Sequence, residues 1–280
     1  MLARWCVPWI VAVAIATLLA SGAPVRAEAV VHEHAGLELS GNLVVPKDRS
    51  IDRDGVALIL HGTLAHHGME MIAALQRNLA AKGVPSLAIT LSLGLNARKG
   101  MFDCALEQDH RNIDAVEELA AWVDWLKSKG VRRITVIGHS RGASQAAYFV
   151  RDVPGDVITG LVLVAPVIQS RATLAARYKA AFKADLEQVL AEARRLVDEG
   201  EDDKLMEVAF LTCPKARVTA AGFLDYYGED RGAELTAVLP SLKLPVHIIL
   251  AEKDAVANET PAALDAVAKV GNVKRATIAD

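Results

Sequence analysis

Short, uninterrupted apolar runs alternate along this sequence with longer segments that have the apolar spacing of helices. The strand-like runs of the first half are Val56–Leu60, Val84–Thr90, Arg133–Ile137 and Ile158–Val164. The helix-like segments between them are Met69–Lys82, Ile113–Lys129 and Ser140–Val150. Strands that are apolar throughout are typical of parallel sheets, which are buried on both faces. The alternation therefore predicts an α/β fold with a doubly wound, mostly parallel sheet.

The rhythm is interrupted in the second half of the chain. No strand-like run occurs from Pro166 to Pro240, and apolar residues spaced by threes and fours predict one long amphipathic helix from Leu174 to Val197, ending at Gly200. A shorter helix is expected at Val218–Tyr227. We interpret 166–240 as a helical cap inserted between two parts of the core, 28–165 and 241–280. The aromatic residues Phe223, Tyr226 and Tyr227 are candidates either for lining an acyl pocket or for the core.

Three further strands and one helix complete the expected core. Leu37–Val45 alternates enough to be an early antiparallel strand, ended by Pro46. After the insertion, Val246–Leu250 and Lys274–Ile278 read as strands, and Pro261–Val267 as a helix between them.

The first residues have the pattern of an export signal. Arg4 is the only charged residue before Arg26, and the apolar run Val7–Ala20 is about 14 residues long, which is short for a bilayer core that needs about 20. Small residues flank Arg26, so we expect a signal peptide, 1–27, cut after Ala27 or Ala29. The alternative is an uncleaved anchor helix. No second stretch is long and apolar enough to span a membrane, so we expect a periplasmic or secreted protein with no stable membrane span after cleavage.

Two cysteines remain once this segment is removed, Cys104 and Cys213. An isolated pair in an exported protein is a disulfide candidate. Two buried free thiols are the alternative, because one pair carries no spacing signature.

Composition argues against several function classes. Hydrophobic residues make up 52% and charged residues 23% of the 280, which excludes an intrinsically disordered chain. A net charge of −3 with 5% aromatic residues disfavours a nucleic-acid-binding protein. The phosphate-binding, dinucleotide-binding and zinc-protease motifs are missing. His32 and His34, and the adjacent His66 and His67, lack the carboxylate or cysteine partners of a metal site, so no metal is expected.

Gly138-His139-Ser140-Arg141-Gly142 lies where a predicted strand passes into a predicted helix. A serine on such a corner must adopt a strained backbone angle, and the glycines two positions before and after it remove the collisions that side chains would cause. The hydroxyl of Ser140 then projects from the carboxyl end of the sheet. This context favours a nucleophile over an ordinary glycine-containing turn.

A second motif, His61-Gly62-Thr63, directly follows the strand Val56–Leu60. Acyl transfer needs backbone N–H groups aimed at the oxyanion of the tetrahedral intermediate. We expect one from Arg141 and the other from Thr63, with Leu64 as the alternative. We expect His61 to shape the loop rather than to transfer protons.

An acidic residue follows the strand Val246–Leu250 on the carboxyl side of the serine. Asp254 could orient an imidazole and stabilise its cation. Its alternative role is to cap the loop, and Glu252 and Asp225 are weaker candidates for the acid.

These three motifs, in this order, resemble the α/β-hydrolase family over Leu37–Asp280. The resemblance implies a serine hydrolase that needs no cofactor, with Ser140 as nucleophile and 166–240 as its lid. The implied substrate is a small molecule or acyl compound with an ester, thioester or amide bond. The alternative is a non-catalytic protein of the same fold that binds a ligand or partner, or an inactive truncated product.

One part of the family pattern is missing. The catalytic histidine of the family follows the last strand, but none of the eight histidines of this sequence lies after Asp254. We therefore expect that the sequence is a truncated record or a broken gene. The alternative is that His66, His67 or His110 acts as the base, because a triad is defined by geometry rather than by chain order.

The signal-peptide interpretation makes a direct prediction. The mature protein should begin at Glu28 or Val30, since small residues precede both cleavage points. Intact-mass measurement on the exported protein tests this, and a membrane fraction that retains Met1–Ala27 would indicate an anchor instead.

Overall fold

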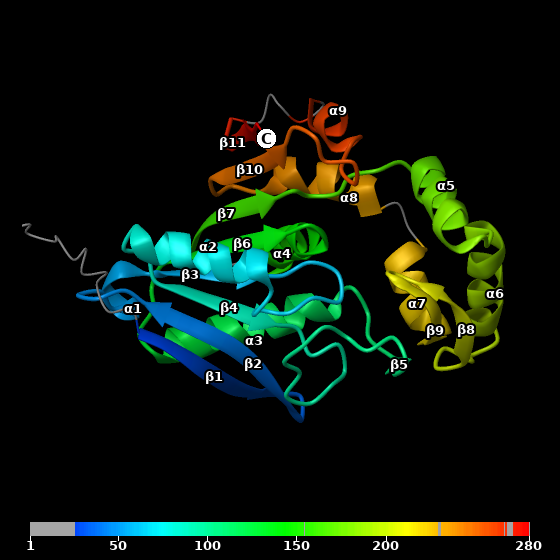
Figure 1. Cartoon of the computed structure of the whole chain (residues 1–280), viewed down its shortest axis with the longest axis horizontal. Coiled ribbons are helices and arrows are strands. Elements are labelled where there is room, and N and C mark those ends of the chain that lie inside the picture. The colour runs from blue at the N-terminus through cyan, green and yellow to red at the C-terminus, as the bar shows by residue number, and fades with distance from the viewer. Residues whose placement is uncertain (1–25, 154, 229–230, 266, 268–270, 280) are drawn as a thin grey trace, which may run out of the picture.

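The computed structural model describes residues 26–153, 155–228, 231–265, 267 and 271–279. Its centre is an eight-stranded sheet with the strand order β1-β2-β4-β3-β6-β7-β10-β11 (Figure 1). The strands are β1 (Arg26–His34), β2 (Leu37–Val45), β3 (Val56–Leu60), β4 (Ser86–Thr90), β6 (Ile134–His139), β7 (Ile158–Val164), β10 (Val246–Ala251) and β11 (Val273–Ile278). From β4 to β11 all neighbouring strands are parallel, as the alternation predicts.

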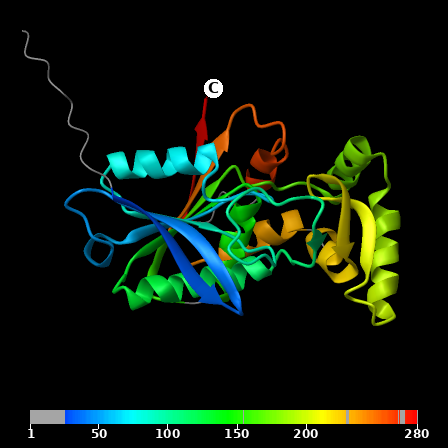
Figure 2. The ribbon, with the colours of Figure 1, turned by 60° about the horizontal axis from the view of Figure 1, so that its bottom comes forward.

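Helices cover both faces of this sheet (Figure 2). On one face lies α2 (Glu70–Ala81), whose Ile72 packs in a small cluster with Ile59 of β3 and Ile137 of β6. On the other lie α3 (Asp114–Ser128) and α4 (Arg141–Asp152), which contribute to the larger cluster. All five residues of β3 and all five of β4 are buried, which is why β3 is a continuous apolar run and β4 has an apolar centre, Leu87–Ile89.

The first strand, β1, is an addition to the predicted fold. It pairs antiparallel with β2 along its whole length, through a tight turn in which Ala35 and Gly36 have positive φ. Only Val30 of β1 is buried, so its sequence lacks the alternation that marks β2. The signal-peptide prediction falls almost wholly outside the described residues, because only Arg26 and Ala27 of that segment belong to β1.

The insertion between β7 and β10 differs from the predicted helical cap in two respects. The first is that the long helix is two helices, α5 (Arg171–Phe182) and α6 (Leu186–Asp198). Lys183 has a left-handed backbone with φ 58°, and the carboxylate of Asp185 accepts hydrogen bonds from the N–H groups of Glu187 and Gln188. An N-cap of this kind starts a new helix, so a continuous apolar stripe does not imply a continuous helix.

The second difference is a β-hairpin where no strand was expected. β8 (Leu205–Phe210) pairs antiparallel with β9 (Cys213–Thr219), and β9 pairs in parallel with the two-residue β5 (Glu107–Gln108) of the core. Most of β9 alternates exposed polar with buried residues, as in Arg217 and Val218. One of its pairing partners, β5, is far away in the chain, so its strand character depends in part on a tertiary contact rather than on a local apolar run.

Shorter elements complete the chain. They are α1 (Ile51–Asp54), α7 (Ala220–Tyr227), α8 (Arg231–Val238), the 3-10 helix η1 (Leu239–Ser241) and α9 (Thr260–Asp265). Among the described residues, no helix combines the length and the apolar character needed to cross a membrane.

The aromatic residues of the insertion belong to the core. Phe223 is fully buried, and Tyr226 and Tyr227 are nearly so. Their rings pack against one another and against Phe210, with centroids 5.1 Å apart for Phe210 and Tyr226. Of the two roles considered for these residues, packing of the insertion against the core is the one that the structure shows.

The structure joins Cys104 and Cys213 in a disulfide, with a Cα–Cα distance of 5.5 Å. Cys104 lies in the loop between β4 and α3, and Cys213 begins β9. The bond therefore links the core to the hairpin of the insertion across 109 positions of the chain.

Loss of this bond should weaken the fold. A loop of this length loses much conformational entropy in the unfolded state when it is closed, so Cys213→Ser should lower the free energy of unfolding by roughly 2–4 kcal/mol. Urea denaturation measures the effect. Cys104→Ser should cost the same and the double variant no more than either single one, whereas two reactive thiols in oxidised, denatured protein would contradict the bond.

Candidate active site

Ser140 stands at a strained corner between β6 and α4. Its backbone has φ 54° and ψ −121°, a conformation that side-chain-bearing residues rarely adopt. A Cβ atom on Gly138 would lie 2.2 Å from the carbonyl oxygen of Gly142, and one on Gly142 would lie 2.2 Å from the carbonyl oxygen of His61. Glycine is therefore required at both positions because any side chain would collide with a carbonyl oxygen, and not because the backbone needs conformational freedom there.

Neighbouring backbone groups hold this corner in place. The N–H of Ser140 donates to the carbonyl oxygen of Val164 at the end of β7, at 2.9 Å, and its own carbonyl accepts from the N–H of Ala143. The serine thus stands at the amino end of α4, where the helix dipole favours negative charge.

The predicted oxyanion loop passes directly beside the serine. A Cβ atom on Gly62 would lie 3.2 Å from Cβ of Ser140, so glycine is what allows this approach. The side chain of Arg141 reaches back to the same loop, where its Nε donates to Oγ1 of Thr63 at 3.2 Å. The structure thus brings Thr63, Arg141 and Ser140 together, and the aim of the two N–H groups at an oxyanion remains a prediction.

His61 is fully occupied in holding that loop. It is 1% exposed. Its Nδ1 donates to the carbonyl oxygen of Gly62 at 2.7 Å, while its Nε2 accepts from the N–H of Leu91 at 3.0 Å. Burial lowers the pKa of His61 to about 3, so the ring is neutral at ordinary pH. With neither nitrogen free, His61 connects the loops after β3 and β4 and is not placed to act as a base.

Two buried charged residues that the sequence did not single out reinforce these loops. Arg98, 7% exposed, donates from Nη2 to the carbonyl oxygen of Ala65 and from Nε to that of Leu91, both at 2.7 Å. Glu118 of α3 accepts from the N–H and the hydroxyl of Ser92. Arginine and glutamate are usually surface residues, so nothing in their local sequence indicates these roles.

Burial shifts the pKa values of Glu118 and Arg98 in opposite directions. Burial raises the pKa of Glu118 to about 7, against the hydrogen bonds from Ser92. Burial lowers the pKa of Arg98 to about 10, with Glu118 opposing the change. Arg98 therefore stays protonated at neutral pH, whereas Glu118 gains or loses its proton near pH 7.

Asp254 follows β10 on the same edge of the sheet as Ser140. Its Oδ1 accepts from the N–H groups of Val256 and Ala257, at 2.8 and 2.9 Å, which fixes the carboxylate. Burial lowers the pKa of His139, and the charge of Asp254 raises it in part, so the carboxylate lies within electrostatic reach of the residue before the serine.

The weaker acid candidates have different surroundings. Asp225 accepts from the N–H groups of Asn112 and Ile113, so it fixes the start of α3. Glu252 is exposed, and its N–H donates to the carbonyl of Ile278.

Each of the three histidines considered as alternative bases makes a hydrogen bond through Nδ1, and Nε2 of His110 is buried without a partner among the described residues. Nδ1 of His67 lies 2.6 Å from Oγ1 of Thr90, and Nδ1 of His66 accepts from the N–H of Gly68. Nδ1 of His110 lies 3.0 Å from the hydroxyl of Tyr226, and burial lowers the pKa of His110 to about 3. In the part of the chain that the structure describes, no imidazole is hydrogen-bonded to Ser140, and no three potential ligands are grouped to hold a metal.

Comparison with known proteins shows the family of this chain. Residues 57–277 match the model of the alpha/beta hydrolase family. The chain belongs to this family. Similar solved structures include Est1E from Butyrivibrio proteoclasticus with ferulic acid bound, which has a TM-score of 0.62 at 20% identity and covers 89% of each chain.

Two other solved structures extend the likeness of the fold. An esterase from Pyrococcus furiosus has a TM-score of 0.56 at 18% identity, over 91% of this chain and 82% of the other. Naproxen esterase (carboxylesterase NP) from Bacillus subtilis has a TM-score of 0.54 at 16% identity, over 93% and 86%. No curated protein sequence matches the chain. The resemblance of the motifs to the family, and the α/β-hydrolase fold, are confirmed.

The raised pKa of Glu118 predicts a pH dependence of stability. An unfolded Glu118 loses its proton near pH 4.5, whereas the folded one keeps it until about pH 7, so this residue makes the protein less stable as pH rises through that window. Glu118→Gln should remove this contribution, because an amide can still accept from the N–H of Ser92.

Urea denaturation at pH 5 and pH 8 tests this prediction. The free energy of unfolding should fall less between the two pH values in Glu118→Gln than in the unaltered protein. The exposed neighbour Glu117 provides the control, and Glu117→Gln should leave the difference unchanged. Equal pH profiles for all three proteins would show that Glu118 titrates normally.

Proposed function

We propose that this protein is an exported serine hydrolase that cleaves an ester, thioester or amide bond through Ser140. The observation that carries the proposal is the strained corner itself. A backbone φ of 54° at Ser140, with no room for a side chain at Gly138 or Gly142, serves no purpose in packing. Such strain is found where a nucleophile must be presented at a helix N-terminus. Family membership supports hydrolase activity, and the esterases among the solved structures share the fold.

The reaction follows from this placement. Oγ of Ser140 attacks the carbonyl carbon of the substrate, and its proton passes to a base. The oxyanion that forms is stabilised by the N–H groups of Arg141 and Thr63. The bond to the leaving group breaks, and that group takes the proton from the base. Water then attacks the acyl-enzyme and loses a proton to the base. The bond between the acyl carbon and Oγ breaks, the base returns the proton to Oγ, and the carboxylic acid is released.

The base is the one element that is not assigned. Asp254 accepts from the N–H groups of Val256 and Ala257 through Oδ1 and so caps its own loop, and we propose that the same carboxylate orients the base. No histidine follows Asp254 in the 280 residues. The proposal therefore needs an experiment on the nucleophile that stands apart from one on the base.

The disulfide supports the proposal of export. Disulfides persist in oxidising compartments and are rare in the cytosol of most organisms. A bond between Cys104 and Cys213 is consistent with the signal-peptide pattern before Arg26, and both features favour the periplasm or the exterior.

A fluorophosphonate probe tests the nucleophile. We expect covalent labelling at Ser140, located by peptide mass mapping, and no labelling of Ser140→Ala. Ser144→Ala, one turn further along α4, should be labelled like the unaltered protein. A folded sample in which Ser140 stays unlabelled under all conditions would overturn the serine-hydrolase proposal and favour a non-catalytic binding protein.

Substitutions of the three alternative histidines test the base. Removing a true base costs several orders of magnitude in rate. Because none of these three histidines is hydrogen-bonded to Ser140 in the described part of the chain, we expect that changing each of His66, His67 and His110 to Gln alters the labelling rate by less than about tenfold. A larger loss in one variant would assign that histidine as the base.

A further inference from the structure

The amino ends of the central parallel strands carry a concentration of exposed positive side chains. Lys47 follows β2, Lys82 precedes β4, and Arg132 and Arg133 precede β6. Because β2, β4, β3 and β6 are neighbours in the sheet, these residues gather at one end of the molecule. Together with side chains from the last turns of α2 and the end of α3, they form what we call the basic edge: Lys47, Arg77, Lys82, Lys129, Arg132 and Arg133.

The charge of this edge is largely uncompensated. Within the described ranges, none of its six side chains pairs with a carboxylate, whereas the nearby Asp54 is occupied by Arg49 and Arg53. The chain as a whole has a net charge of −3. The positive surface is therefore a local arrangement and not a result of overall composition.

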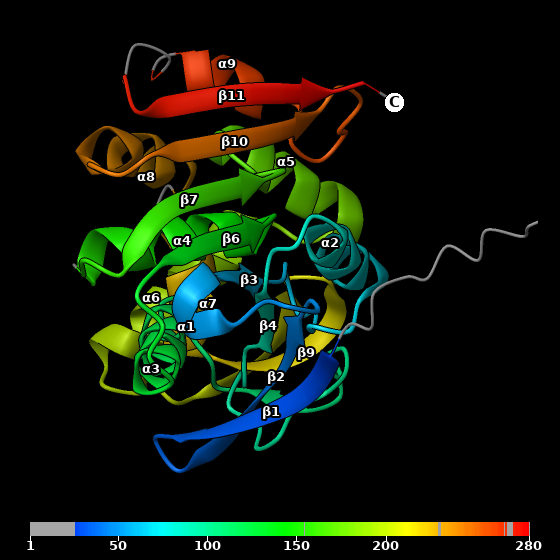
Figure 3. The same ribbon diagram turned by 90° about the vertical axis from the view of Figure 1, so that its left-hand side faces the viewer.

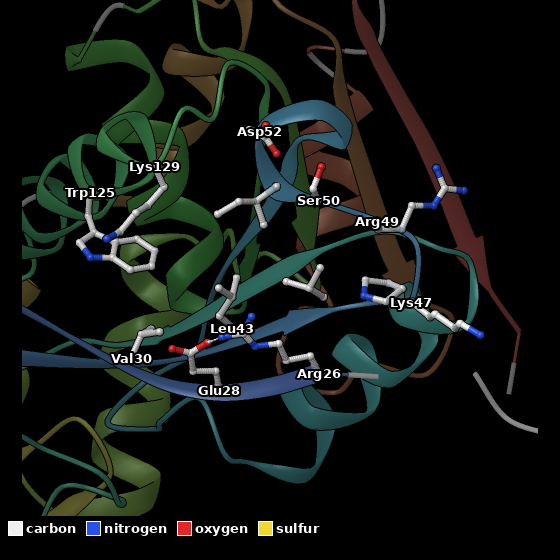
Figure 4. Close-up of a pocket in the computed structure, with 13 residues that line it drawn as sticks. Arg26, Glu28, Val30, Leu43, Lys47, Arg49, Ser50, Asp52, Trp125 and Lys129 are labelled. Atoms are coloured by element: carbon white, nitrogen blue, oxygen red, sulfur yellow. Dashed lines mark hydrogen bonds and ion pairs between the residues drawn. The ribbon is translucent and has the colours of Figure 1, made fainter. Parts of the chain in front are cut away.

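A pocket opens beside the basic edge and combines charge with apolar surface. Its volume is about 490 Å³. The side chains of Lys47 and Arg49 lie across it from Trp125 and Lys129 (Figure 4). Nζ of Lys129 lies 5.3 Å from the centre of the Trp125 ring. Val30 and Leu43 supply apolar wall. The carboxylates of Glu28 and Asp52 also line the pocket, and Glu28 is paired with Arg26. Because Lys47, Arg49 and Lys129 leave the lining with an excess of positive charge beside apolar surface, it suits a group that has both a phosphate and hydrocarbon.

The N-terminal segment joins the fold at the same place. Arg26 pairs with Val45 at the end of β2, two residues before Lys47. The apolar run Val7–Ala20 ends six residues before Arg26, a span of at most about 20 Å when extended. If that run enters a bilayer, during export or as an anchor, the basic edge is held close to the lipid surface.

We propose that the basic edge is a docking surface for a bilayer that contains anionic phospholipid, with lipid phosphates entering the pocket between Lys47 and Lys129. Lysine and arginine near such a surface are attracted by its negative potential, and an amphipathic ring such as Trp125 suits the headgroup level. The sheet fixes the orientation, because Ser140 follows β6 at the carboxyl ends of the strands, whereas α1, which precedes the amino end of β3, faces the viewer in Figure 3. The docked protein would present its candidate active site away from the membrane.

Sedimentation with lipid vesicles tests the proposal on the full chain. The probes are vesicles of phosphatidylcholine alone and vesicles with about one third phosphatidylglycerol, at about 0.1 M salt. We expect the protein to partition more strongly to the anionic vesicles, since the apolar N-terminal run contributes equally to both. The triple variant Lys47→Gln, Lys82→Gln, Lys129→Gln should lose about tenfold or more of the anionic partitioning.

A matched variant controls for total charge. Lys179→Gln, Lys183→Gln, Lys215→Gln removes the same charge from exposed sites on the insertion and should bind like the unaltered protein. Thermal melting and fluorophosphonate labelling of both triple variants verify that each is folded. An equal loss in the two variants, no preference for anionic vesicles, or tighter binding to duplex DNA than to anionic vesicles would overturn the proposal.

Discussion

The carbonyl oxygen of His61 occupies the space that a side chain at position 142 would need. This single contact brings the loop after β3 against the first turn of α4, and the rest of the candidate site depends on it. Gly142 permits the approach, Gly138 permits the return of the chain beneath it, and Ser140 is left at the top of the corner with φ 54°. Strain of this kind costs of order 1–3 kcal/mol, so the surroundings must hold it firmly.

They do so with buried polar groups rather than with apolar packing alone. His61, Arg98 and Glu118 tie together the loops that leave β3 and β4, and each is buried at a cost unless its hydrogen bonds are made. Loops lack the repeating backbone hydrogen bonds that hold a helix or a sheet in place. Side chains with several donors or acceptors hold these loops instead. The core gives up some stability, most visibly in the displaced pKa of Glu118, and gains a defined position for the loop beside Ser140.

Most of the sheet could be predicted because its strands are buried on both faces, which leaves a local signature in runs such as Val56–Leu60 and Ile158–Val164. The corner at Ser140 could be predicted because glycines at fixed offsets have a steric reason. What could not be predicted depends on contacts and backbone breaks that no apolar pattern marks. β9 is a strand because β8 and β5 pair with it, the apolar stripe over α5 and α6 hides the break at Lys183, and Arg98 has a role only where two loops meet.

The bond between Cys104 and Cys213 has a mechanical consequence. An insertion joined to its core only through the chain after β7 and before β10 could turn about those two points as a rigid body. A covalent link to the hairpin, reinforced by the pairing of β9 with β5, supplies a third point of attachment well away from that axis. Three points of attachment resist rotation of the insertion relative to the core. The restraint extends to α5 and α6, because the hydroxyl of Tyr178 donates to the carbonyl oxygen of Ala209 in β8, and Leu190 of α6 packs in the same core cluster as the hairpin.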